Sequence, residues 1–162
     1  MIYSKRYNKF VPVNIEKNEY MIPGYGKMTR YTVKDNKIPI GNVDLKDTDN
    51  GVYVLYIQNK NNELYSGFGK IADQLEVEHC KNRGLDTFEI TSEASLNSHV
   101  QHYKRGKRFY DDNVNRLIGN MIDTNPEGTK FDTRFLGNVK MFMPKELINK
   151  YLDIIKNFKL LK

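Results

Sequence analysis

Hydrophobic and polar residues alternate over much of positions 27–34 and 38–45, and positions 52–57 form a short continuous run of β-branched, aromatic and other apolar residues. Both patterns predict β-strands. The separating segments 35–37 and 47–51 are polar, and the second contains Asn-Gly, which accepts the positive φ of a tight turn. The pattern therefore predicts three antiparallel strands connected as a meander.

After Phe68 the apolar residues are spaced by three and four, which predicts a helix over about residues 70–83. Gly84 follows at the position where glycine commonly ends a helix. A short alternating stretch at 87–91 predicts another strand, and Ser95 is a suitable cap for a second helix over about 95–104.

The strands at 52–57 and 87–91 are joined by one helix, so they are expected to lie parallel in one sheet with a right-handed crossover. Further along, the spacing predicts a helix over 112–123, a strand over 135–143 and an amphipathic helix that starts at Pro144. The predicted fold class is α/β (α+β), with a mixed sheet flanked by helices.

Composition changes this picture little. The chain has 162 residues, 39% of them hydrophobic and 28% charged, which fits a single globular domain over 1–162. Neither a membrane span nor a signal peptide is visible, and the lone Cys80, which cannot form an intramolecular disulfide, is interpreted as a small buried hydrophobe. A cytoplasmic location is expected.

The net charge of +6 favours an anionic partner, such as nucleic acid, a phosphorylated cofactor or acidic lipid. The one dense basic cluster, at 104–108, is interpreted first as a solvated surface and second as a contact to phosphate. Aromatic residues alternate with it too sparsely to stack nucleic-acid bases. Nucleic acid is therefore not the favoured partner.

The segment Ser66-Gly67-Phe68-Gly69-Lys70 joins the strand at 52–57 to the helix at 70–83. Two glycines let backbone N–H groups approach an anion closely, and the N-terminus of the following helix carries a partial positive charge. This segment is interpreted either as an anion-binding turn or as a turn whose glycines serve only steric needs.

Over about residues 27–109 the chain resembles the Gcn5-related N-acetyltransferase family. The family's loop pattern of Gln or Arg, two residues, Gly, one residue, and Gly or Ala is matched by residues 64–69 in both glycines, whereas Leu64 replaces the polar residue. Asn97, Tyr103 and Phe109 stand approximately at the family's later Asn, Tyr and Phe. By this resemblance, 27–109 is the acetyl-CoA-binding core of a single domain, and 110–162 adds a helix, a strand and a C-terminal helix.

The resemblance implies direct transfer of an acetyl group from acetyl-CoA to an unidentified primary amine. The pyrophosphate of the coenzyme would accept hydrogen bonds from the backbone amides of residues 67–70. The cofactor-binding residues implied are Leu55, Ile57, Gly67, Phe68, Gly69, Lys70 and Asn97. A backbone N–H near Leu55 or Tyr56 would stabilise the developing oxyanion.

Tyr103 is the candidate general acid for the departing thiolate, and packing of its ring in the core is the competing interpretation. No general base stands out among Glu89, Tyr56 and His99. His99 and His102 share a helix face but lack a third ligand, so no metal is expected.

Two further hypotheses stay open: a catalytically inactive binding or regulatory domain of the same fold, which Leu64 favours, and a basic nucleic-acid-binding protein. The amphipathic C-terminal helix is expected to close the core, and an exposed apolar face on it would serve a homodimer or a membrane surface.

Overall fold

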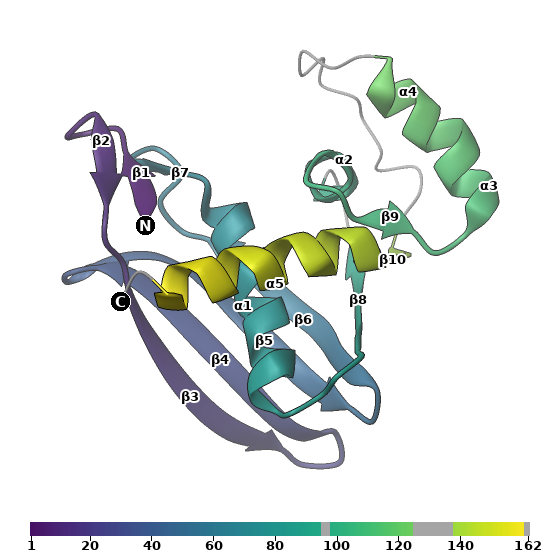
Figure 1. The fold of residues 1–162 in the computed structure, drawn as a ribbon, viewed down its shortest axis with the longest axis horizontal. Coiled ribbons are helices and arrows are strands. Elements are labelled where there is room, and N and C mark those ends of the chain that lie inside the picture. The colour runs from purple at the N-terminus through teal and green to yellow at the C-terminus, as the bar shows by residue number, and fades with distance from the viewer. Residues whose placement is uncertain (95–97, 125–137, 161–162) are drawn as a thin grey trace. The chain divides into compact units, whose positions relative to one another are not determined.

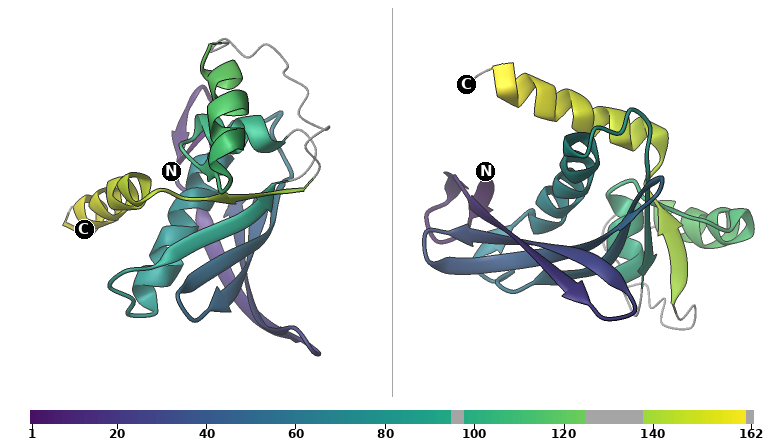
Figure 2. Two further views of the ribbon diagram at one scale, coloured as in Figure 1. Left: turned by 90° about the vertical axis from the view of Figure 1, so that its right-hand side faces the viewer. Right: turned by 90° about the horizontal axis from the view of Figure 1, so that it is seen from below.

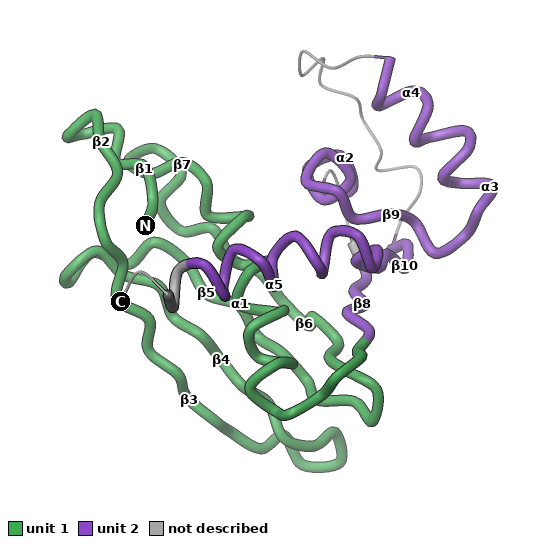
Figure 3. The backbone as a smooth tube through the Cα atoms, in the orientation of Figure 1, with its two compact units in different colours: residues 1–88 green, residues 89–162 purple. Residues whose placement is uncertain are grey.

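The structure is a computed structural model that describes residues 1–94, 98–124 and 138–160 (Figure 1). The chain divides into two compact units, residues 1–88 and residues 89–162, which Figure 3 colours green and purple. Each unit is described by itself below. No helix in the described ranges is long and apolar enough to span a bilayer.

The first unit is built on a meander of antiparallel strands. Its elements are β1 (Ile2–Ser4), β2 (Lys9–Val11), β3 (Asn14–Ile22), β4 (Gly26–Asp35), β5 (Ile38–Thr48), β6 (Gly51–Asn59), β7 (Tyr65–Ser66) and α1 (Phe68–Asn82). Strands β3 to β6 pair in chain order, and α1 packs against β5 and β6 on one face (Figure 2). The predicted strands at 27–34, 38–45 and 52–57 and the predicted helix at 70–83 are therefore confirmed.

Strand β3 was not predicted. Seven of its nine residues are exposed, and the other two, Tyr20 and Ile22, are half-buried. An edge strand without a buried face has no apolar alternation, so its sequence carries no signal of period two. It is held instead by its backbone ladder to β4.

The N-terminal segment forms a separate small sheet. Strand β1 pairs with β2 on one side and with the short β7 on the other, and the N–H of Lys5 donates to the carbonyl of Leu64 at 2.8 Å. The sheet therefore fixes the stretch of chain that leads directly into α1.

The first turn of α1 sits unusually close to the sheet. Phe68 is 2% exposed, and its ring occupies the space that a side chain at Gly41 on β5 would fill. A Cβ on Gly41 would lie 2.6 Å from Cζ of Phe68 and 2.4 Å from the carbonyl oxygen of Gln58 on β6. The absence of a side chain at this position allows the contact.

The second unit contains β8 (Glu89–Ala94), α2 (Ser98–Lys104), β9 (Arg108–Phe109), α3 (Asp112–Val114), a π-helical turn (Asn115–Gly119), α4 (Asn120–Asp123), β10 (Val139–Phe142) and α5 (Lys145–Leu160). Strand β10 lies between β8 and β9 and is antiparallel to both. The side chains of its core cluster come from α2, β9, the π-helical turn, α4 and β10: Val100, Tyr103, Phe109, Ile118, Ile122 and Met141.

Most predicted elements of this unit are present with changed bounds. The helix expected over 112–123 is one continuous run of α3, the π-helical turn and α4, and the helix after Pro144 is α5. The strand expected at 87–91 is β8, over 89–94, and the strand expected at 135–143 is β10, over 139–142. Ser95 and residues 135–137 lie outside the described residues. The parallel pairing of strands 52–57 and 87–91 and the single domain over 1–162 stay predictions.

Substituting Gly41→Ala tests the contact that seats α1 on the sheet. Because the neighbours of the new Cβ include the backbone of β6, the clash cannot be relieved by a rotamer change, and we expect a loss of about 2 kcal/mol in the free energy of unfolding. Urea denaturation measures it. Asn18→Ala, on the exposed β3, is the control and should change stability by less than about 0.5 kcal/mol. Equal stability of both variants would contradict this packing.

Candidate functional site

The strand β6 carries an irregularity at Leu55. In the ladder between β5 and β6, Asp44 pairs with Tyr56 and the next residue, Leu45, pairs with Val54, so Leu55 has no partner on β5. Two residues of one strand opposing one of the other define a β-bulge, which bends the strand and releases its backbone from the regular ladder. Leu55 is 38% exposed. The bulge therefore lies at the stretch of backbone that is expected, from the family resemblance, to donate to the oxyanion.

The N-terminus of α1 has no side-chain cap. Its N-cap is Gly67, which has a left-handed conformation with φ of 95°, and the first intrahelical bond runs from the N–H of Ile71 to the carbonyl of Gly67 at 3.4 Å. The N–H groups of Phe68, Gly69 and Lys70 precede that bond and so have no acceptor within the helix. No acidic residue lies in the first turn of α1.

A comparison within the chain shows what a capped helix start looks like here. At α3, the carboxylate of Asp111 accepts hydrogen bonds from the N–H groups of Asn113 and Val114, at 2.8 and 3.4 Å. An N-cap of this kind usually stabilises a protein by about 1 kcal/mol. At α1 no side chain caps the corresponding donors, and the helix dipole adds a partial positive charge to them.

The loop before α1 is tied to the sheet by Tyr65. Its hydroxyl donates to Oδ2 of Asp35 at the end of β4, at 2.7 Å, and both residues are at least nine-tenths buried. Burial, and then the hydrogen bond to Asp35, raise the pKa of Tyr65 to about 12. The hydroxyl therefore stays protonated at neutral pH and keeps the loop attached.

The opposite end of α1 is held by a polar network that the sequence did not reveal. The hydroxyl of Tyr31 lies 2.7 Å from Nδ1 of His79, and Nε2 of His79 lies 2.7 Å from Oδ1 of Asp47. Arg83 donates to the carbonyls of Gly51 and Thr48 at 2.5 and 3.1 Å. These residues are far apart in the sequence, and only the fold brings them together. The network anchors the C-terminal end of the helix.

Tyr103 lies in the core of the second unit. It is 7% exposed, its ring stacks on Phe109 with centroids 5.9 Å apart, and its hydroxyl donates to Oδ2 of Asp123 at 3.2 Å. Burial raises its pKa. A Cβ on Gly119, in the π-helical turn, would lie 2.5 Å from the hydroxyl oxygen. Every one of these contacts serves packing, and the role of acid stays a prediction.

The other predicted residues have varied surroundings. Ile57 is half-buried and pairs with Val43, Tyr56 is 51% exposed on β6, and Glu89 is exposed at the start of β8. His99 is fully buried, with its ring centroid 6.2 Å from that of Phe109. Asn97 lies outside the described residues. The bulge at Leu55 and the loop at residues 67–70 both belong to the first unit, whereas Tyr103, Glu89 and His99 belong to the second unit.

Comparison with solved structures identifies the fold. An acetyltransferase of Bacillus subtilis, solved in complex with CoA, superposes with a TM-score of 0.53 over 82% of this chain and 98% of that chain, at 19% identity. Nourseothricin acetyltransferase gives a TM-score of 0.47 at 14% identity, over 82% of this chain and 86% of that chain. No family model and no curated protein matches the sequence. The first comparison confirms the predicted acetyltransferase-type α/β fold.

Cys80 tests the burial of the inner face of α1. Burial raises the pKa of its thiol to about 12, so at pH 8 only about one molecule in ten thousand carries the reactive thiolate. We expect the native protein to react with Ellman's reagent at least about a thousandfold more slowly than free cysteine. Unfolding in urea should restore the ordinary rate. Fast reaction of the native protein would contradict the packing of α1.

Proposed function

We propose that this protein is an acetyl-CoA-dependent N-acetyltransferase that acetylates a primary amine. The observation that carries the proposal is the uncapped first turn of α1, which follows the left-handed Gly67 in a fold shared with a CoA-bound acetyltransferase. A helix N-terminus with free N–H groups suits a phosphate anion.

The residues present fit the coenzyme. The N–H groups of Phe68, Gly69 and Lys70 would donate to the pyrophosphate, and the exposed ammonium of Lys70 adds a positive charge in the same turn. A side chain at Gly67 would meet nothing within 4 Å, so the space beside it is open. The pantetheine arm would run along β6 past Leu55 and Ile57, where the bulge frees the backbone from β5.

The chemistry needs few side chains. The neutral amine attacks the thioester carbonyl, a C–N bond forms, and the amine nitrogen loses its proton to solvent. The C–S bond breaks, and coenzyme A leaves as a thiolate that takes a proton from Tyr103 or from solvent. The charge on the carbonyl oxygen grows during this attack, and a backbone N–H at Leu55 or Tyr56 would stabilise it. Tyr56 is exposed beside the bulge, where it can contact an acceptor.

A second candidate function is a binding or regulatory domain of the same fold without turnover. The observation that favours it is Leu64, which is 37% exposed and stands where the related loop pattern has Gln or Arg. This alternative shares the coenzyme site but not transfer. Coenzyme binding without acetylation of any amine in a broad screen would favour it over the enzyme.

Substituting Gly67→Val tests the coenzyme site. Valine is strained at positive φ and places methyl groups beside the free amides, so we expect acetyl-CoA affinity to fall about tenfold or more, because hydrogen bonds to a charged group are lost. Calorimetric titration measures it. In the wild type, acetyl-CoA at a hundred times its dissociation constant should stabilise the fold by about 2.7 kcal/mol.

The matched control is Gly84→Val. Gly84 follows the other end of α1, also has positive φ, at 82°, and also has open space around it. The two substitutions therefore cost similar backbone strain, and only the first touches the proposed site. Equal affinity of Gly67→Val and Gly84→Val for acetyl-CoA would contradict the proposed coenzyme site.

Substituting Tyr103→Phe separates its two roles. If Tyr103 is the acid, turnover with a preferred amine falls by about a hundredfold or more, since general acid catalysis contributes at least that factor. If Tyr103 only packs, turnover stays within about twofold, and loss of the bond to Asp123 costs about 1 kcal/mol of stability. Steady-state kinetics and urea unfolding distinguish the two results.

A further inference from the structure

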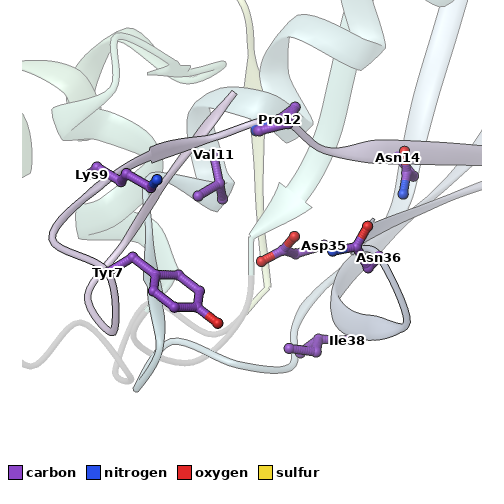
Figure 4. A pocket seen from close by; sticks show the side chains of 8 residues that line it. All are labelled: Tyr7, Lys9, Val11, Pro12, Asn14, Asp35, Asn36 and Ile38. Atoms are coloured by element: carbon purple, nitrogen blue, oxygen red, sulfur yellow. The ribbon is translucent and has the colours of Figure 1, made fainter.

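A cavity in the first unit is lined by residues outside the proposed coenzyme site, and only Asp35 among them also holds the loop before α1, through Tyr65. It has a volume of about 310 Å³, and Figure 4 shows the side chains around it. They come from the N-terminal hairpin, the start of β3 and the turn between β4 and β5: Tyr7, Lys9, Val11, Pro12, Asn14, Asp35, Asn36 and Ile38. This volume is at the low end of ligand sites, which suits a small metabolite and excludes a coenzyme.

Asp35 is the distinctive member of this cavity. The residue is only 9% exposed, and one of its oxygens accepts the hydroxyl of Tyr65 at 2.7 Å. In the described part of the chain, no other hydrogen bond and no ion pair to its carboxylate is found. Figure 4 shows the carboxylate directed into the space between the labelled residues. A buried carboxylate that accepts only one hydrogen bond is stabilised by a cationic ligand that donates further hydrogen bonds to it.

Lys9 supplies the opposite charge at the cavity wall. It is exposed on β2, and no ion pair between Lys9 and another side chain is found in the described residues. The wall also contains apolar surface from Val11, Pro12 and Ile38. The cavity thus offers an acceptor for an ammonium, a donor for a carboxylate and an apolar wall for a side chain.

We propose that this cavity binds a small zwitterionic ligand of the amino-acid type, with its ammonium on Asp35 and its carboxylate on Lys9. The hydroxyl of Tyr7, which Figure 4 shows turned toward the same space, can bond either group. The cavity is formed by the first unit alone, and the proposal does not rest on acetyl transfer.

Three probes with the same branched carbon skeleton test the charges. L-Leucine carries both charges, isoamylamine only the ammonium, and 4-methylpentanoate only the carboxylate. Titrated into the full-length protein at pH 7 and millimolar concentration, leucine should bind best, isoamylamine about tenfold more weakly, and 4-methylpentanoate not measurably. Absence of leucine binding, or binding of 4-methylpentanoate as tight as that of leucine, would overturn the proposal.

Two variants assign the charges to residues. Asp35→Asn keeps an acceptor for Tyr65 but loses the charge, and should weaken leucine and isoamylamine binding at least about tenfold. Lys9→Met, at an exposed position, should lower leucine affinity to that of isoamylamine and leave isoamylamine unchanged. Asp49→Asn, in the exposed turn before β6, is the control and should bind leucine like the wild type. Unchanged leucine affinity in either test variant contradicts the proposed site.

Discussion

The seating of Phe68 over Gly41 is the contact on which the proposed chemistry depends. The ring occupies space that a side chain on β5 would deny it, and the carbonyl of Gln58 closes the same gap from β6. This contact fixes the first turn of α1 against the sheet, so the free N–H groups of residues 68–70 have a defined position. Gly67 supplies the left-handed turn that brings the chain from β7 into the helix. The packing of α1 and the proposed anion site therefore depend on adjacent residues.

Helices α1 and α3 begin in different ways. Asp111 caps α3 with its own carboxylate, whereas α1 begins at a glycine that satisfies no amide with a side chain. With glycine at the N-cap, the helix forgoes only about a few tenths of a kcal/mol relative to a capping side chain. The hydrogen bond from Tyr65 to Asp35 and the network of Tyr31, His79 and Asp47 hold α1 at its two ends instead. The amides at its start are the proposed donors to the coenzyme.

Sequence patterns predicted the parts of the fold with a buried and an exposed face. Strand β4 and helices α1 and α5 were found from periodicity, because burial on one side imposes a regular spacing, and strands β5 and β6 were found from their β-branched and aromatic residues and the polar turns beside them. Strand β3 was not predicted because most residues on both of its faces are exposed. The glycine turn before α1 was predicted because its signal is local, and its role as an anion site stays a prediction. The bulge at Leu55, the contact between Phe68 and Gly41 and the cavity at Asp35 each join distant segments, which leaves no local signal.

We propose that the first turn of α1 binds the pyrophosphate of acetyl-CoA. Amide chemical shifts of the ¹⁵N-labelled protein, recorded during titration with acetyl-CoA, test it most directly. We predict that the largest changes occur at the N–H groups of Phe68, Gly69 and Lys70, with smaller ones at Leu55 and Tyr56. The amides of Lys81 and Asn82, at the far end of the same helix, should stay unchanged. Unshifted amides at residues 68–70 under saturating coenzyme would contradict the account.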